Sequence, residues 1–275
     1  MLSITLGPFA LPVAPVLLLL AVWLVSWLAS RISPGDANGA HRSAAGHAVQ
    51  HAALIGLVAA RLGHLALHAD VYAATPWAAF DLRDGGWHVP TGVLAGLAWM
   101  AWRGSRLPAL RRPLAVAGSA GMVLWIAASV ATTLGQTRAL PELVFTELNS
   151  GAKISLPEAA RGRPVVVNLW ASWCGPCRQE MPMLAAAQQR ESTVGFLFVN
   201  QGESDSAVRA YLTDQGLALR EVLLDGGSKL GPAVGSRGLP TTLFYDARGQ
   251  QVDAHVGVLN AAALESRLRQ LREPR

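Results

Sequence analysis

Cysteine is scarce in this 275-residue chain, which contains only Cys174 and Cys177. Two cysteines cannot build a disulfide scaffold, so the fold must rely on hydrophobic cores. A structural zinc site is disfavoured because it needs about four ligands, and His255 is the one Cys or His that follows the pair. A structural disulfide is disfavoured because so short a loop stabilises a chain little. The spacing therefore favours redox chemistry at this pair.

Charged residues are also few. They make up 15% of the sequence, against 51% hydrophobic residues, and the mean hydropathy is +0.30. The net charge is +5, but the basic residues are scattered or flank apolar runs. Without a basic patch interleaved with aromatics, nucleic acid is not an expected partner. The length suggests about two domains. Because the first half is much more apolar, we expect a membrane domain at residues 1–136 and a soluble domain at residues 137–275.

Four apolar runs in the first half are candidate membrane spans, because a helix needs about 20 residues to cross a bilayer. The first run is unlike a cleavable signal peptide, since no Lys or Arg precedes it and the run is too long. The third run is short and rich in glycine. The predicted spans are residues 11–32, 48–69, about 89–102 and 114–134.

Arginines between these runs predict their orientation. The first and third loops are arginine-rich, whereas the second is acidic in balance. The positive-inside rule places arginine-rich loops in the cytoplasm. The N-terminus, the second loop and everything after the fourth run are then outside, which predicts a multi-pass protein of a bacterial inner membrane with a periplasmic second half. The arginines concerned are Arg31, Arg42, Arg103, Arg106, Arg111 and Arg112.

Polar residues in the second run are candidates for a site in the membrane domain. Arg61 and His64 are three residues apart, and a charge within a membrane is a functional hypothesis by default. The alternative is an arginine in a packed interior that pairs with Asp70 or with a lipid headgroup. Histidines spaced by four are more typical here of helix ends than of haem or metal ligands, so no metal is expected. These pairs are His47 with His51 and His64 with His68.

Two stretches of the first half resemble the early part of prolipoprotein diacylglyceryl transferases. They are residues 60–63 (Ala-Arg-Leu-Gly) and 84–96 (Asp-Gly-Gly-Trp-His-Val-Pro-Thr-Gly-Val-Leu-Ala-Gly). Aligned on the two glycines, the functional His of that family falls on Pro90, and the later spans of that family are absent. The resemblance covers residues 10–134 and implies a shared membrane scaffold, with lipid modification or lipid binding as an alternative function. This half has no cysteine, so it cannot relay electrons by thiol exchange.

The second half alternates apolar β-type runs with helix-capable segments. This order, closed by a hairpin and a helix, predicts a mixed sheet with helices on both faces. Ser204 is expected to cap a helix, Gly216 to end it, and Pro182 to kink the helix before it. Strands are predicted at residues 144–148, 152–156, 165–170, 194–200, 220–224, 242–245 and 251–257. Helices are predicted at residues 174–190, 204–215, 229–234 and 260–271.

The cysteine pair lies where the strand 165–170 gives way to a helix. The strand delivers Cys174 to the first helical turn, where unpaired backbone N–H groups and the helix dipole stabilise a thiolate. The thiolate is the reactive form. Cys177 lies one turn further on the same face, so it can close and reopen a disulfide with Cys174. Pro176 falls in the first turn, where a missing N–H costs little.

The second half resembles the thioredoxin fold, and within it the membrane-anchored TlpA/ResA-like thiol–disulfide oxidoreductases of bacteria. The match covers nearly all of residues 140–272 and includes the active-site sequence Trp-Cys-Gly-Pro-Cys at 173–177. Other stretches at family positions are residues 178–182, 199–204 and 238–242.

The resemblance implies a substrate-binding surface around the cysteines. Pro240 would be a cis-proline beside the disulfide, and Leu239 would offer backbone hydrogen bonds to a substrate chain. The ring of Trp173 is expected to face the substrate together with Gly175 and Pro176, whereas Trp170 is expected in the core.

Polar residues near the pair are predicted to tune its chemistry. Thioredoxin has a buried Asp in its central strand, whereas the matching residue here is Asn168, so a proton acceptor for Cys177 must come from elsewhere. Glu180 resembles the active-site glutamate of the ResA-like enzymes. A partly buried carboxylate there would have a raised pKa and could exchange a proton with Cys177. A solvated helix glutamate is the alternative. Glu203 also falls at a family position, in a loop.

The sequence therefore predicts a membrane-anchored enzyme that reduces disulfides of periplasmic proteins through Cys174 and Cys177, with Glu180 as the proton acceptor and no bound cofactor. A membrane dithiol protein would supply the electrons. Apocytochrome c cysteines are one substrate class that the resemblance implies. The alternatives are a disulfide oxidant or isomerase of the same fold, which the Gly-Pro dipeptide disfavours, a lipid-modifying or lipid-binding protein, and a plain membrane anchor for the redox domain.

Overall fold

The computed structural model describes residues 3–6, 9–34, 40–74, 76–81, 85–135, 139–236 and 238–273. The chain forms two compact units. The first, called here the sheet unit, comprises Met1–Pro12, Val71–Gly85 and Gly135–Arg275. The second, called the helical unit, comprises Val13–Asp70 and Gly86–Leu134.

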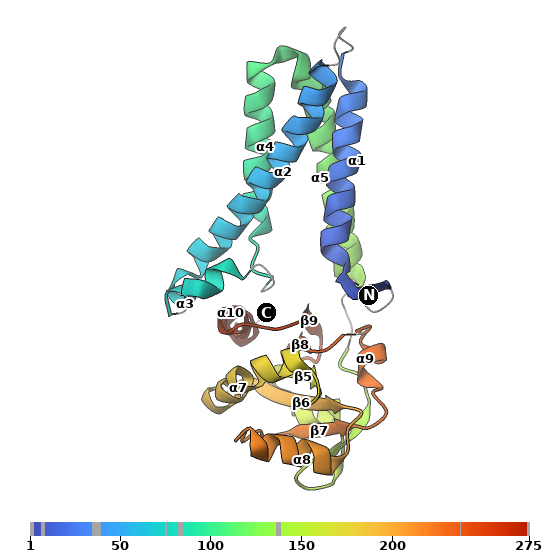
Figure 1. Cartoon of the computed structure of the whole chain (residues 1–275), viewed down its shortest axis with the longest axis vertical. Coiled ribbons are helices and arrows are strands. Elements are labelled where there is room, and N and C mark those ends of the chain that lie inside the picture. The colour runs from blue at the N-terminus through green and yellow to red at the C-terminus, as the bar shows by residue number, and fades with distance from the viewer. Residues whose placement is uncertain are drawn as a thin grey trace. The chain divides into compact units, whose positions relative to one another are not determined.

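Each of the four apolar runs in the first half forms a helix (Figure 1). The first begins at Val13 and not at Leu11, because Leu11 lies in a short strand, and the second begins at Ala40, well before the predicted Ala48. Among the described residues, His41–Leu67 is the one helix long and apolar enough to cross a membrane, and Leu17–Ile32 is a shorter apolar helix. Four membrane spans therefore stay a prediction. The helices are α1 (Val13–Ile32), α2 (Ala40–Leu67), α4 (Val89–Arg106) and α5 (Arg111–Gly135).

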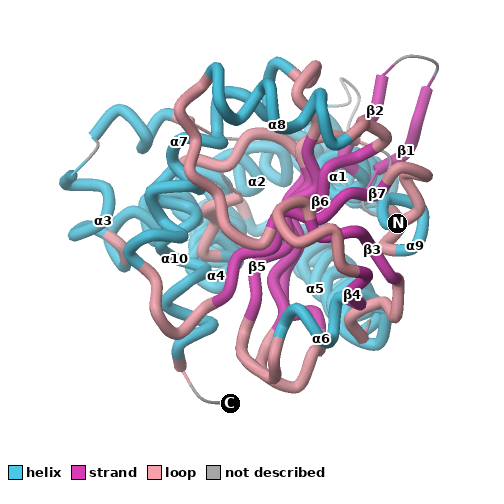
Figure 2. Tube along the Cα trace, turned by 90° about the horizontal axis from the view of Figure 1, so that it is seen from below, coloured by secondary structure: helices cyan, strands magenta, loops and turns pink. Residues whose placement is uncertain are grey.

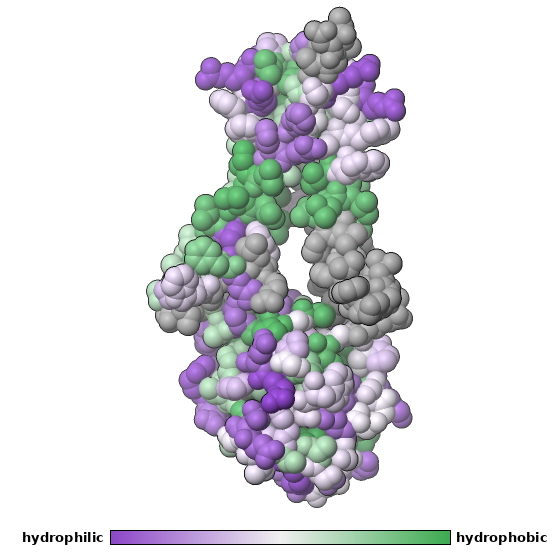
Figure 3. Space-filling view, in the orientation of Figure 1, coloured by the Kyte–Doolittle hydropathy of each residue, from purple (hydrophilic) through white to green (hydrophobic). Residues whose placement is uncertain are grey.

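Both arginine-bearing turns of the helical unit lie at the same end of it (Figure 1). The α1–α2 turn is held by Ser33 Oγ, which donates to the carbonyl of His41 over 3.2 Å. The α4–α5 turn contains the 3₁₀-helix η3 (Pro108–Leu110), and Arg111 Nε donates to the carbonyl of Gly104 over 3.2 Å. Hydrophilic side chains gather at this end, and apolar ones lie further along the helices (Figure 3). Below the turns, one apolar cluster joins Val25, Ala29, Ala45, Ala48, Val49, Leu110, Leu114 and Ala117.

Helices α2 and α4 touch backbone to backbone, which explains why the third apolar run is rich in glycine. A Cβ on Gly56 would lie 2.9 Å from the carbonyl oxygen of Gly92, and a Cβ on Gly92 would lie 2.7 Å from that of Gly56. Any larger side chain at either position would push the helices apart.

The predicted mixed sheet is confirmed as a seven-stranded sheet with the order β4-β3-β7-β6-β5-β8-β9. Strand β5 pairs in parallel with β6, as β6 does with β7, and the other neighbours are antiparallel. The strands are β3 (Val144–Glu147), β4 (Lys153–Ser155), β5 (Val165–Trp170), β6 (Gly195–Gln201), β7 (Val222–Asp225), β8 (Thr241–Tyr245) and β9 (Gln251–Val256). A separate hairpin that the sequence did not predict is formed by β1 (Ser3–Leu6) and β2 (Phe9–Pro12).

Helices cover both faces of this sheet (Figure 2). On one face, α7 (Gly175–Arg190), α8 (Asp205–Asp214) and α10 (Ala261–Arg272) share an apolar core with the alternate β5 residues Val166 and Trp170. On the other face, α6 (Leu156–Ala160) and α9 (Leu230–Ala233) pack against residues such as Val167 and Leu169. Because β5 is buried on both sides, all six of its residues are buried, which matches a sequence that is apolar at every position except Asn168.

The helix that Ser204 was predicted to cap is present, whereas a capping box that begins another helix was missed in the sequence. Ser204 Oγ accepts from the backbone N of Ala207 over 3.3 Å, so it caps α8 as expected. Helix α7 continues past Pro182 to Arg190. Helix α6 was not predicted, although Ser155 and Glu158 form a capping box at its start. The acidic loop also contains two unpredicted helical segments, α3 (Ala69–Ala74) and η1 (Pro76–Phe80).

Candidate redox site

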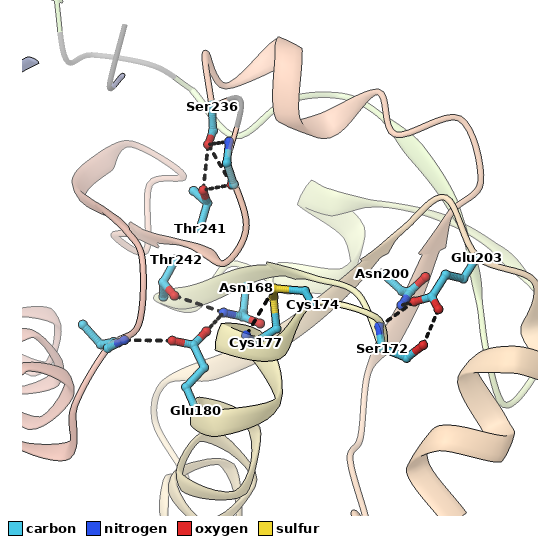
Figure 4. The surroundings of a disulfide bond; sticks show 12 residues. Asn168, Ser172, Cys174, Cys177, Glu180, Asn200, Glu203, Ser236, Thr241 and Thr242 are labelled. Atoms are coloured by element: carbon cyan, nitrogen blue, oxygen red, sulfur yellow. Dashed lines mark hydrogen bonds between the residues drawn. A yellow bond between two sulfur atoms is a disulfide. The ribbon is translucent and has the colours of Figure 1, made fainter. Parts of the chain in front are cut away.

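The two cysteines form a disulfide at the N-terminus of α7, with 2.13 Å between the sulfurs and 5.2 Å between the Cα atoms (Figure 4). Strand β5 ends at Trp170, and Cys174 is the N-cap residue of α7. The Sγ of Cys174 accepts a hydrogen bond from the backbone N of Cys177 over 3.2 Å. In the reduced protein the same N–H and the helix dipole would stabilise a thiolate on Cys174.

The surroundings of the two sulfurs differ. Cys177 is completely buried, whereas Cys174 keeps 6% of its surface exposed. The adjacent Trp173 is 70% exposed, and Gly175 and Pro176 are exposed as well. A partner protein can therefore reach the pair from the side of Cys174.

The peptide bond between Leu239 and Pro240 is cis, as the resemblance implied. Leu239 packs against the apolar cluster that contains both cysteines. The turn is held by two buried hydroxyls, because Thr241 Oγ1 donates to the carbonyl of Gly238 over 2.7 Å and lies 2.6 Å from Ser236 Oγ. This hydroxyl pair, drawn in Figure 4, was not singled out from the sequence. It shows that the backbone before Pro240 is fixed by its own neighbours.

Glu180 is buried behind the disulfide, with 1% of its surface exposed. Its Oε1 accepts from Asn168 Nδ2 over 2.8 Å, and its Oε2 accepts from the backbone N of Leu259 over 2.8 Å. Burial raises the pKa of Glu180 from the ordinary 4.5 to about 7, although the hydrogen bonds from Leu259 and Asn168 oppose the shift. The predicted direction of the shift is confirmed, and the burial is more complete than the sequence suggested. A carboxyl with this pKa can take up or release a proton near neutral pH.

Asn168 connects β5 to two other elements. Its Nδ2 donates both to Glu180 on α7 and to Thr242 Oγ1 on β8, the latter over 3.0 Å. The sequence identified Asn168 only as the place where a buried Asp is missing. Its role in holding Glu180, and the contribution of Thr242, depend on the register that pairs Asn168 with Thr242 across β5 and β8.

Glu203 holds the segment that leads to the active-site motif. Its carboxylate accepts from the backbone N of Ser172 over 2.7 Å, from the Ser172 hydroxyl, and from Asn200 Nδ2 over 2.6 Å (Figure 4). Ser172 directly precedes Trp173 and Cys174. These hydrogen bonds connect Glu203 to the loop and to β6, which favours a positioning role over proton transfer to a sulfur.

Arg61 and His64 lie together in the helical unit. Arg61 is 7% exposed, and its Nη1 donates to the carbonyl of Gly86 over 2.9 Å. A Cβ on Gly86 would lie 2.6 Å from the His64 ring and 2.7 Å from Arg61. The backbone N of His88 donates to the carbonyl of Ala60 over 2.9 Å. The two stretches that the sequence singled out, 60–63 and 84–96, therefore contact each other through their described residues.

His64 of α2 also lies close to His68, which directly follows this helix, since the two rings stack with centroids 4.3 Å apart. Within the part of the chain that the structure describes, no three His, Cys, Asp or Glu side chains are grouped so that they could hold a metal.

Comparison with known proteins identifies the family of the sheet unit. The Redoxin family matches residues 135–270. The thiol-disulfide oxidoreductase ResA of Bacillus thuringiensis (strain Al Hakam) is 32% identical over 133 residues, which are 48% of this chain and 75% of that protein. This chain belongs to the ResA-type thiol–disulfide oxidoreductases. It is therefore a thioredoxin-like enzyme that exchanges thiols and disulfides.

Two other relatives agree with this family. The thioredoxin-like protein YneN of Bacillus subtilis (strain 168) is 34% identical over 123 residues, which are 43% of this chain and 71% of that protein. The thiol:disulfide interchange protein DsbE of Pseudomonas fluorescens biotype C is 34% identical over 100 residues, 36% of this chain and 55% of that protein. The Redoxin match begins at residue 135. The resemblance of residues 10–134 to prolipoprotein diacylglyceryl transferases stays a prediction.

Proposed function

We propose that this enzyme reduces disulfide bonds in proteins outside the cytoplasm, with Cys174 as the nucleophile and Cys177 as the resolving thiol. The observation that carries the proposal is the arrangement of one accessible sulfur, one buried sulfur and a buried carboxyl. Cys174 keeps 6% of its surface exposed beside the exposed Trp173, Cys177 is completely buried, and Glu180 lies three residues further along α7 with its pKa raised by burial to about 7. Cys174 can therefore attack an external substrate, and the buried Cys177 can then resolve the mixed disulfide.

The reaction begins with the reduced dithiol. The Cys174 thiolate attacks one sulfur of a substrate disulfide, which breaks that bond, forms a mixed disulfide and releases the other substrate sulfur as a thiolate. Glu180 takes the proton of Cys177, whose thiolate then attacks Sγ of Cys174. The mixed disulfide breaks, the substrate leaves with both sulfurs reduced, and the enzyme retains the Cys174–Cys177 disulfide. Two electrons have passed to the substrate, whose thiolates take up two protons.

The substrate is expected to lie over the exposed surface beside Cys174. Trp173, Gly175 and Pro176 form one side of it, and the backbone at Leu239 and Pro240 would hydrogen-bond an extended segment of the substrate. Main-chain recognition of this kind suits many sequences, because the hydrogen bonds do not depend on the side chains of the substrate. Apocytochrome c, the substrate class that the resemblance implies, fits this chemistry.

Electrons must come from another protein. The chain has no cysteine besides the active pair, so its helical unit cannot pass electrons by thiol exchange. We infer that a membrane dithiol protein reduces the Cys174–Cys177 disulfide. The disulfide itself serves as the redox group, without a bound cofactor.

The helical unit would place the enzyme in a bacterial inner membrane through four spans. The position of both arginine-bearing turns at one end of the unit supports an orientation in which that end faces the cytoplasm. The N-terminus and the sheet unit are then in the periplasm. The contact of Arg61 with Gly86 supports a packing role for this arginine in the unit.

Replacing the resolving cysteine tests the proposal. The full-length Cys177→Ser variant, expressed in a bacterial host, should accumulate mixed disulfides through Cys174 that dithiothreitol releases. The matched Cys174→Ser variant should accumulate none, because its remaining sulfur is buried. If Cys177→Ser traps no protein above the level of Cys174→Ser, the reductase proposal is wrong.

The direction of exchange needs a second measurement. The only two thiols of the full-length protein can be counted with a maleimide mass tag after equilibration in glutathione or dithiothreitol buffers. A reduction potential near that of thioredoxin, about −270 mV, would support a reductase, whereas a value near about −120 mV would indicate a disulfide oxidant.

A further inference from the structure

A buried oxygen beside the disulfide lacks a hydrogen-bond donor. Asn168 is 1% exposed, and its Oδ1 receives no hydrogen bond from any residue that the structure describes. Buried carbonyl oxygens are almost always satisfied, because desolvating them without a partner costs free energy. An unsatisfied acceptor in the interior of a redox domain therefore requires an explanation.

The orientation of the Asn168 side chain is fixed by its other end. Nδ2 donates to Glu180 and to Thr242, so both of its hydrogens are used and the amide cannot rotate without breaking two hydrogen bonds. Because Glu180 and Thr242 hold the nitrogen, the oxygen must face elsewhere.

The oxygen faces the region of Cys177. Side chains alternate along a strand, so Asn168 points to the same face of the sheet as Val166 and Trp170. Those two residues belong to the apolar cluster that also contains Cys177. Figure 4 shows the carboxamide of Asn168 next to the disulfide, with Glu180 on its other side.

We infer that Oδ1 of Asn168 accepts a hydrogen bond from the Cys177 thiol when the disulfide is reduced. This rests on the proposed function only in that the pair must cycle between two oxidation states. An external dithiol supplies two electrons and two protons and becomes a disulfide itself. The S–S bond of the enzyme breaks, Cys177 keeps one proton as a thiol, and Cys174 releases the other to become the thiolate. Cys177 is completely buried. Asn168 then provides the acceptor for its new S–H group.

The consequence is a preference for the reduced form. The oxygen is unsatisfied when the sulfurs are joined and satisfied when Cys177 carries a proton, so Asn168 shifts the equilibrium toward the dithiol. The same side chain holds Cys177 through its oxygen and Glu180 through its nitrogen. Asn168 is thus a positioning residue that keeps the proton donor and the proton acceptor side by side.

The S–H stretching vibration tests this directly. In the full-length Cys174→Ala variant, Cys177 is the sole thiol, and its infrared band should lie at the lowered frequency of a hydrogen-bonded thiol. Adding Asn168→Leu should move the band up to the frequency of a free thiol. Adding Thr242→Val is the matched control, because it removes the other partner of Nδ2 and leaves Oδ1 in place, so the band should not move. A band that is the same with Asn168 and with Leu at this position would overturn the inference.

A second variant covers a failure of Asn168→Leu to fold. Asn168→Val likewise removes Oδ1, with a smaller side chain that suits a strand, so a lowered S–H frequency that persists in this variant would also overturn the inference. Reduction equilibria give an independent readout. Asn168→Leu with both cysteines present should be reduced about tenfold less favourably by dithiothreitol, which corresponds to about 30 mV, and Thr242→Val should change the equilibrium less than about twofold. An equilibrium unchanged by Asn168→Leu would contradict the proposal.

Neither readout uses a protein substrate. An absence of mixed disulfides in Cys177→Ser would overturn the proposed reductase and leave the S–H band as predicted. An unshifted S–H band would overturn the role of Asn168 and leave the trapping result intact.

Discussion

Oε2 of Glu180 accepts a hydrogen bond from the backbone N of Leu259 over 2.8 Å and so joins α7 to the segment before α10. The carboxyl that it holds is removed from water, with 1% of the Glu180 surface exposed. The raised pKa of Glu180 follows from that burial, whereas the hydrogen bond from Leu259 opposes the shift.

Replacing Glu180 by Gln should slow the resolution of the mixed disulfide. The wild-type rate should rise with pH through about 7, where Glu180 ionises and can accept the proton of Cys177. Because general base catalysis contributes about 10²–10⁴-fold, the variant should be on the order of 100-fold slower at pH 8 and should lack this inflection. Stopped-flow measurements with a disulfide-bonded peptide give the rates. Glu142→Gln, which changes an exposed glutamate, is the control. A pH profile of Glu180→Gln that matches the wild type would refute the base role.

The stability of the oxidised sheet unit should fall as pH rises from about 4.5 to about 7. The folded protein keeps the Glu180 proton up to about pH 7, whereas the unfolded chain releases it near 4.5. The folded state therefore binds more protons in this window, and its extra stability is complete below pH 4.5 and lost above pH 7. A shift of this size corresponds to about 3 kcal/mol.

Denaturant-dependent hydrogen exchange in peptides from β5 and β6 of the full-length protein measures this stability. In Glu180→Gln the loss of stability between pH 4.5 and pH 7 should be smaller by about 3 kcal/mol, because the amide does not titrate. If the stability of Glu180→Gln depended on pH as steeply as that of the wild type, other titratable groups would be responsible for the dependence.

Trp170 and Trp173 are separated by three positions, but replacement by Ala should affect the stability of the protein very differently at the two sites. Trp170 is completely buried, so its truncation should lower the free energy of unfolding by about 3–5 kcal/mol. Trp173 is 70% exposed, so its truncation should change that energy by less than about 0.5 kcal/mol.

Kinetics should separate the two residues as well. Trp173→Ala should raise the KM for a protein substrate while the rate with a small disulfide reagent stays near wild type, since only the larger substrate uses the ring. Equal losses with both substrates would show that Trp173 acts on the cysteine chemistry and not on substrate binding.

Arg61→Ala should destabilise the helical unit without altering the cysteine chemistry. A buried hydrogen bond from a charged group contributes about 1.5–3 kcal/mol, and the variant loses the contact with Gly86. Thermal unfolding in detergent and the rate with a small disulfide reagent provide the two readouts, and Arg42→Ala, at an exposed arginine, is the control. If Arg61→Ala abolished function in cells while both the fold and the thiol chemistry stayed intact, a separate lipid-directed activity of this unit would be favoured.

Local sequence patterns predicted the elements that carry the site. The run 165–170, apolar except at Asn168, identified the buried strand β5, and the Cys-Gly-Pro-Cys sequence identified the start of α7. The missed helix α6 is only five residues long and contains Pro157, so its periodicity gave no signal and only its capping box could have revealed it. The hairpin of β1 and β2 was missed because its residues continue into the apolar run of α1.

Contacts between distant segments could not be read from the sequence. The raised pKa of Glu180 was expected, but the hydrogen bond that limits the shift comes from Leu259, which lies 79 residues away. The contact of Asn168 with Thr242 spans 74 residues and requires the register of two antiparallel strands. The contact of Arg61 with Gly86 gives a packing reason for two motifs that the sequence showed only as separate stretches.

The unequal burial of the two sulfurs also determines how the enzyme is damaged. In the reduced state Cys174 is the sulfur that meets peroxide or an electrophile first, since Cys177 is completely buried. Sulfenic acid on Cys174 would still be rescued, because Cys177 can condense with it to restore the disulfide. Oxidation beyond that stage, to sulfinic acid, would be irreversible and would leave Cys177 intact but useless. The buried thiol thus protects the enzyme against mild oxidation, and only a second oxidation that outpaces disulfide closure inactivates it.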